Sequence, residues 1–191
     1  MNDALYRIRS ALEGGFIAQS YPVLAQPGVR DEDMLVHSLG CSLWTTLGHD
    51  LGFSAVVEAP APSASGADIR SDSAWFTRGD WRPVVLVEFE RFEGGERGQS
   101  KLLAKLQNLM EAAWRWGTDP RLLVLSAWSK GVVNAPRTEV FRELLRSGFR
   151  NAAGVRVPGY QDLPLLVHRL ILNSGGTRLL SLDRSLLEEI W

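Results

Sequence analysis

The sequence predicts an α/β fold in which a mixed central sheet is flanked by helices. Two segments, 84–92 and 121–128, are rich in apolar residues, as expected of strands covered on both faces. The segment between them, 99–116, has apolar residues at helical spacing, so the three together indicate a strand, a helix and a parallel strand. Further strand candidates directly precede residue 84, and strands in direct succession indicate hairpins, which makes the sheet mixed.

The N-terminal part of the chain is predicted to be helical. Apolar residues at 3–13 fall on one face of a helix, which ends at two glycines. A proline-containing loop follows over 18–33. A second helix is expected at 31–48, because an aspartate can cap its start and leucines recur there every four residues.

The middle of the chain predicts three strands in succession. The segments 53–59 and 69–76 have strand character, and a loop of small residues at 60–68 separates them. A turn at 77–83 then leads into the strand at 84–92. These strands precede the helix at 99–116.

The C-terminal part continues the alternation of strands and helices. A helix is expected at 137–148, ended by Gly148. Periodicity alone leaves 163–173 open as a strand or as a strand followed by a helix. The tail at 181–191 is expected to be helical, with Asp183 as its cap.

Length and composition bound the organisation and the location of the protein. The 191 residues suggest a single domain over 1–191, with a core at about 31–173, an N-terminal helix and a helical tail. A formal net charge of −1 gives no global attraction for nucleic acid, so any such role needs a local basic patch. The single cysteine excludes an internal disulfide, and no signal peptide or membrane-length apolar run is present. A cytoplasmic protein without a membrane partner is therefore expected.

Three carboxylates are expected to meet at one end of the sheet. Glu88 and Glu90 are two residues apart on one strand and so share a face. If the preceding turn is centred near Asp80, antiparallel pairing places Asp72 opposite Glu88. Oxygen ligands without a nearby histidine motif suit a hard cation, so Mg²⁺ or Mn²⁺ is the expected cofactor.

The helix after this strand carries two lysines at a useful spacing. Lys101 and Lys105 are four residues apart and therefore share a helical face. If that face is directed at the end of the strand, either lysine would reach a scissile phosphate. The alternative is that the lysines, like Glu88 and Glu90, are solvated surface charges. The histidines show no metal-binding spacing, and Cys41 is interpreted as a small buried apolar side chain.

These residues resemble the motif of the PD-(D/E)XK nuclease superfamily. The resemblance rests on Asp72, followed after fifteen residues by Glu88-Phe89-Glu90 at the end of an apolar strand. The predicted element order over residues 31–128 is also similar to the restriction-endonuclease-like core: helix, three strands, helix, strand.

The resemblance implies roles for individual residues. Asp72 and Glu88 would be metal ligands, and Glu90 stands where the superfamily usually has lysine. Lys101 or Lys105, on the following helix, would then supply the lysine. Glu32 resembles the acidic residue that some members place near the metal from the preceding helix, and with Glu90 it completes the expected ligand set.

The expected function is therefore metal-dependent hydrolysis of phosphodiester bonds, with DNA as the substrate. Asp72, Glu88 and Glu90 would hold an ion that activates water, and a lysine would stabilise the charge on the phosphate. The protein would work as a homodimer or within a larger complex. The alternative is a catalytically inactive domain of the same fold that acts as a binding or scaffold subunit in nucleic-acid processing or defence. An enzyme acting on small molecules on an unrelated α/β scaffold is a third alternative, for which no motif is present.

Overall fold

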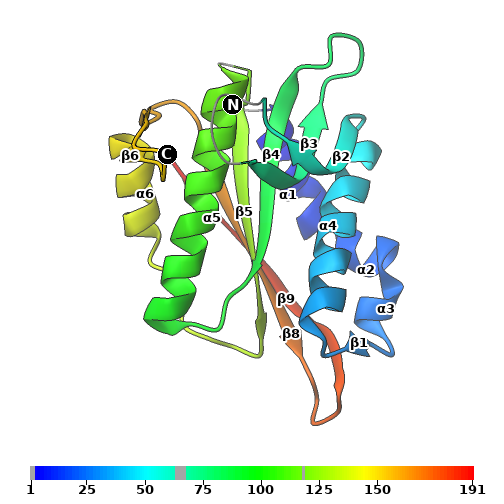
Figure 1. Ribbon diagram of the computed structural model, residues 1–191. Helices are drawn as coiled ribbons and strands as arrows, with labels where there is room; N and C mark the ends of the chain where they lie inside the picture. Colours follow the sequence, from blue (N-terminus) through cyan, green and yellow to red (C-terminus); the bar gives the residue numbers. More distant parts are fainter. Residues whose placement is uncertain (1–2, 63–67, 118) are drawn as a thin grey trace.

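A curled, mixed sheet of seven strands forms the centre of the protein (Figure 1). The computed structural model describes residues 3–62, 68–117 and 119–191. The strands of the sheet are β1 (Val29–Arg30), β2 (Ser54–Pro60), β3 (Arg70–Phe76), β4 (Pro83–Arg91), β5 (Leu122–Lys130), β8 (Leu165–Asn173) and β9 (Leu179–Ile190). Their order across the sheet is β1-β9-β8-β5-β4-β3-β2. The central strands β4, β5 and β8 are parallel, and the outer pairs are antiparallel.

Helices cover both faces of the sheet (Figure 1). The described helices are α1 (Asp3–Glu13), α2 (Phe16–Ser20), α3 (Pro22–Ala25), α4 (Asp33–Asp50), α5 (Gly95–Trp116) and α6 (Thr138–Ser147). A small ribbon of β6 (Phe149–Arg150) and β7 (Arg156–Val157) follows α6. Among the described helices, none combines the length and the apolar content that crossing a lipid bilayer requires.

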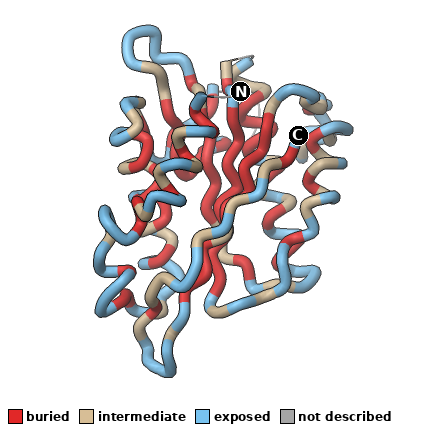
Figure 2. The backbone as a smooth tube through the Cα atoms, turned by 180° about the vertical axis from the view of Figure 1, so that it is seen from behind, coloured by how far each residue is buried: buried red, intermediate tan, exposed pale blue. Residues whose placement is uncertain are grey.

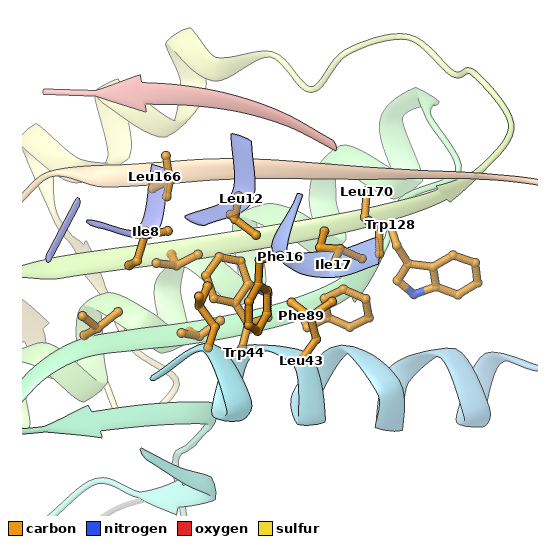
Figure 3. Close-up of a cluster of buried hydrophobic side chains, with 14 of the residues drawn as sticks. Ile8, Leu12, Phe16, Ile17, Leu43, Trp44, Phe89, Trp128, Leu166 and Leu170 are labelled. Carbon is orange, nitrogen blue, oxygen red and sulfur yellow. The ribbon is translucent and has the colours of Figure 1, made fainter. Parts of the chain in front are cut away.

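The alternation of side chains along the central strands produces two apolar layers. On β4, Val85, Val87 and Phe89 pack with α1, α2 and α4, whereas Leu86 packs with α5 and α6. Figure 3 shows the first layer, in which Trp44 of α4 points toward the strands. The strands at the centre are buried almost throughout, and exposed residues are concentrated on the outer helices and the connecting loops (Figure 2). The α/β class and the flanking of a mixed sheet by helices are thus confirmed.

Most of the predicted elements are present with small shifts at their ends. The predicted helices at 3–13, 31–48, 99–116 and 137–148 correspond to α1, α4, α5 and α6. The predicted strands at 53–59, 69–76, 84–92 and 121–128 correspond to β2, β3, β4 and β5. The segment 163–173, whose periodicity fits either a strand or a strand followed by a helix, contains the strand β8. Most of the predicted loop at 60–68 lies outside the described residues.

The predicted C-terminal helical tail at 181–191 is wrong. These residues form β9, which pairs with β8 from Ile190 back to Ser181 and continues to β1. Leucines in this tail fit both helical and strand periods, so the long-range pairing with β8 decides the conformation. The prediction of a loop at 18–33 is also wrong in part, because these residues contain the end of α2 and all of α3 and β1.

Candidate functional site

The site lies where β3 separates from β4. The pairing of these strands begins at Ser73, which is opposite Val87, and the same register places Asp72 opposite Glu88, as the sequence predicts. Asp72 itself is paired with neither β2 nor β4 in the described ladders. Its Oδ2 atom instead accepts a hydrogen bond of 2.7 Å from the backbone N–H of Phe89. A carboxylate therefore replaces a backbone acceptor at the point where the two strands diverge.

Glu88 and Lys105 form a partly buried ion pair across the interface between β4 and α5. The Nζ atom of Lys105 lies 2.7 Å from Oε2 of Glu88. Glu88 is only 1% exposed, whereas the sequence led us to expect it at an exposed edge. Burial, followed by the neighbouring charge of Asp72, raises the pKa of Glu88 to about 8, against the opposing effect of Lys105. Burial lowers the pKa of Lys105, but the two carboxylates outweigh burial and the net change is upward.

Glu90 does not join Asp72 and Glu88, although it shares a face of β4 with Glu88. Its Oε1 accepts a hydrogen bond of 2.9 Å from the backbone N–H of Arg91 and lies 3.8 Å from Nζ of Lys101. Within the described residues, no three carboxylates have oxygen atoms that all lie within 4.8 Å of one another. The expected set of three carboxylate ligands is therefore not formed, because local contacts draw Glu90 toward Lys101.

Glu32 is placed apart from the other predicted ligands. It is exposed, directly precedes α4, and lines a separate hollow with Arg30, Lys130 and Arg178. It is not a member of the ligand group described next. The prediction that Glu32 joins the metal ligands is not supported by this position, because the residue lies before the first turn of α4 rather than on the face that meets Asp72.

Two residues that sequence reasoning set aside converge on Asp72. His37 and Cys41 lie one turn apart on α4, and their ligand atoms and one Asp72 oxygen all lie within 4.8 Å of one another. Burial, followed by the charges of Asp72, Glu58 and Glu88, raises the pKa of the Cys41 thiol to about 12. The spacing of His37 and Cys41 on a predicted helix was the available signal, but such spacing is common and only the fold brings Asp72 to it.

Two hollows open beside the site, and His37 lines both. One of about 340 Å³ includes Cys41 and Glu58, and Glu58 has a backbone φ of 50°. The other, of about 270 Å³, includes Glu90, Arg91 and Lys101. Larger hollows of about 660 and about 500 Å³ share no residue with the site. One hollow therefore opens between α4 and β2, and the other between the start of α4 and the carboxyl end of β4.

No protein-family model, curated protein or solved structure matches this chain. The chemistry of the site is consequently derived from its own side chains. Two adjacent carboxylates with one lysine can hold a hard divalent cation. The histidine, thiol and carboxylate on the α4 side form a second set of donors of a different chemical kind.

Proposed function

We propose that this protein is a metal-dependent nuclease of the PD-(D/E)XK type that acts on DNA. The observation that carries the proposal is the contact of 2.7 Å between Lys105 Nζ and Glu88 Oε2, next to Asp72. The sequence places glutamate where a strand lysine is usual, and α5 brings a lysine to the same acidic group. Of the two lysines considered, Lys105 has this position, and Lys101 lies beside Glu90 instead.

The order of elements supports the same proposal. In chain order, α4, β2, β3, β4, α5 and β5 are a helix, three strands, a helix and a strand. This is the order expected of a restriction-endonuclease-like core. Within it, Asp72 comes from the second strand and Glu88 from the third, as the resemblance implies.

The chemistry of Asp72 and Glu88 fits a hard divalent cation. Burial, followed by the nearby charge of Asp72, raises the pKa of Glu88 to about 8. The single positive charge of Lys105 faces two carboxyl groups. The positive charge of a bound cation would therefore favour the ionised form of Glu88. Asp72 and Glu88 would hold Mg²⁺ or Mn²⁺, which when bound supplies an activated water and polarises a phosphoryl oxygen.

The remaining residues have roles in binding and in charge stabilisation. Lys105 holds the carboxylate of Glu88 in place and contributes positive charge where negative charge develops on the phosphate. Lys101 and Arg91 line the adjacent hollow and would contact the phosphate backbone. In the protein alone both cations are paired with carboxylates, Lys101 with Glu90 and Arg91 with Asp33 and Glu93, so binding of a phosphate would require them to exchange these partners.

A cleavage assay tests the proposal directly. Purified protein is incubated with supercoiled plasmid and with single-stranded DNA, in the presence of Mn²⁺ or Mg²⁺ and in the presence of a chelator. We expect cleavage that the chelator abolishes, and a loss of roughly 100- to 1,000-fold in rate for Lys105→Met. Lys130→Met is the matched control, because Lys130 pairs with Asp31 and lines a different hollow.

The same assay has clear contradictory outcomes. Cleavage that persists in Asp72→Asn would mean that another site or a contaminant is responsible. If no DNA substrate is cleaved and calorimetry detects no binding of Mn²⁺, the proposal of nuclease activity is excluded. Circular dichroism of each variant shows whether a loss of activity reflects loss of the fold.

The burial of Glu88 favours a second candidate function. A carboxylate that is 1% exposed and paired with Lys105 lines neither of the two hollows beside the site. In this second candidate the domain binds nucleic acid or a partner protein without turnover. Binding of DNA that is unaffected by chelator and by Glu88→Gln, with no cleavage, would favour this function over the nuclease.

A further inference from the structure

Three potential metal ligands converge on the α4 side of Asp72. The Nε2 atom of His37 lies 3.6 Å from Sγ of Cys41 and 3.7 Å from Oδ1 of Asp72. The third pair of ligand atoms lies within 4.8 Å. Oδ2 of Asp72 already accepts the hydrogen bond from Phe89, which leaves Oδ1 to face the other two residues.

These separations are close to those of ligands around a tetrahedral zinc ion. With Zn–N of about 2.0–2.1 Å and Zn–S of about 2.3 Å, a tetrahedral angle separates the nitrogen and sulfur by about 3.6 Å. The same construction gives about 3.4 Å for the nitrogen and a carboxylate oxygen. The observed separations of 3.6 and 3.7 Å therefore need shifts of only a few tenths of an ångström.

Direct hydrogen bonding explains these contacts poorly. A separation of 3.7 Å between His37 and Asp72 is too long for a hydrogen bond, and a thiol is only a weak donor or acceptor. The hydrogen bond between His37 Nε2 and Cys41 Sγ, at 3.6 Å, is therefore a weak one. A cation placed among the three ligand atoms would contact all of them.

We propose that His37, Cys41 and Asp72 form a binding site for a zinc-type divalent ion. Nitrogen, sulfur and oxygen donors together suit Zn²⁺ or Co²⁺, whereas Mg²⁺ requires oxygen ligands. The hollow of about 340 Å³ lined by His37, Cys41 and Glu58 gives the ion a path to solvent. With three protein ligands, the fourth position faces this hollow and is open to water or to a small ligand, as in catalytic zinc sites.

The site is separate from the proposed nuclease chemistry, although the two share Asp72. The zinc-type ion lies on the side of α4, and the hard cation would lie on the side of α5, where Lys105 contacts Glu88. The inference therefore does not require nuclease activity. In this arrangement the carboxylate of Asp72 belongs to two ligand sets, one with His37 and Cys41 and the other with Glu88.

Titration of the protein with Co²⁺ tests the site. We expect one Co²⁺ per chain, with the near-ultraviolet charge-transfer absorbance of a cobalt–thiolate bond, and displacement of Co²⁺ by Zn²⁺. Cys41→Ser should abolish the charge-transfer band, and His37→Gln should weaken binding by about 100-fold or more. His49→Gln is the matched control, because His49 is an exposed histidine near the end of the same helix.

Two results would overturn the inference, and one variant separates it from the nuclease proposal. Absence of stoichiometric binding by the wild-type chain excludes the site, as does wild-type affinity in both folded variants, Cys41→Ser and His37→Gln. Glu88→Gln should retain the cobalt–thiolate band while losing binding of Mn²⁺. Loss of the cobalt band in folded Glu88→Gln would contradict two separate donor sets.

Discussion

Asp72 has a structural role that is independent of any metal. Its Oδ2 atom accepts a hydrogen bond of 2.7 Å from the backbone N–H of Phe89, just beyond the last backbone pair between β3 and β4. An unpaired backbone donor that is buried here would cost about 1–3 kcal/mol. Asp72→Asn retains an amide oxygen that can accept this bond, so it separates chemistry from stability better than Asp72→Ala does.

His168 provides a second titratable residue, away from the candidate site. Its ring is fully buried on β8, with Nδ1 2.7 Å from Ser126 Oγ and Nε2 3.0 Å from Ser185 Oγ. The ring is nearly perpendicular to that of Trp44 of α4, with 5.4 Å between the ring centroids. Burial lowers the pKa of His168 from 6.5 to about 4, so the neutral imidazole is the form that the fold requires.

We therefore predict that the free energy of unfolding falls in mild acid. Above pH 6.5 the histidine is neutral in both states, and as the pH falls toward about 4 only the unfolded state gains the proton. The loss from this residue approaches about 3 kcal/mol, at about 1.4 kcal/mol for each unit of pKa difference. Urea unfolding at a series of pH values measures it.

Substitution identifies the residue responsible for this acid sensitivity. His168→Asn should lower stability at neutral pH through lost packing, but it should flatten the dependence on pH between about 4 and 6.5. His49→Asn, at an exposed position, should leave that dependence unchanged. An unaltered slope in His168→Asn would assign the effect to other groups.

Individual residues show what the sequence could and could not predict about the site. The position of the turn predicts the pairing of Asp72 with Glu88 only to within about a residue, because an irregularity between Trp75 and Phe76 shifts the register on the way from the turn to the site. Helical spacing and the resemblance left Lys101 and Lys105 as alternatives, and only the packing of α5 on β4 brings Lys105 to Glu88. The positions of Glu90 and Glu32 depend on contacts at the ends of β4 and α4, which no local pattern encodes.

Element types were predictable wherever one period dominates the sequence. The helices α4 and α5 and the strands β4 and β5 have apolar patterns that admit a single interpretation. The prediction of a helix at 181–191 is wrong because the leucines there fit both the helical and the strand period. Only the pairing with β8 selects the strand. The early helices α2 and α3 are too short to produce a clear periodic signal.

The packing of α4 on β4 depends on the absence of a side chain at Gly40. A Cβ atom at this position would lie 2.2 Å from the ring of Phe89. We predict that Gly40→Ala destabilises the protein, because overpacking of about 1–3 kcal/mol exceeds the gain of about 1 kcal/mol in helix propensity. Chemical unfolding of the two proteins measures the difference.

The control for this prediction lies on the same helix. Ser38 is exposed on α4, so Ser38→Ala changes helix propensity without altering the core. We expect Ser38→Ala to have stability equal to or slightly above that of the wild type. A stabilised Gly40→Ala would show that Phe89 moves aside without cost, which would contradict close packing between these two elements.

At the scale of the whole molecule, β9 completes the sheet. It pairs with β8 along most of its length and carries β1 on its other edge. Leu180 and Ile190 of this strand are fully buried. Removal of the strand would therefore expose the edge of β8 and one end of both apolar layers.

We predict that deletion of residues 179–191 yields insoluble or aggregated protein. A helical tail outside the core, as the sequence predicts, would leave a soluble core instead. Soluble yield and size-exclusion chromatography distinguish these outcomes. Deletion of Trp191 alone is the control, because this residue is 55% exposed and lies after the end of β9; we expect it to behave as the full chain does.

The unusual backbone of Glu58 also affects how copies of this chain can associate. Glu58 lies on β2, the strand at one border of the sheet, with φ of 50°, and Pro60 lacks an N–H. The regular row of outward-facing backbone groups is therefore limited to residues 54–57, which is too short a template for a second chain. The irregular backbone at Glu58 thus protects the sheet against edge-to-edge aggregation, and we expect any homodimer to use a different surface.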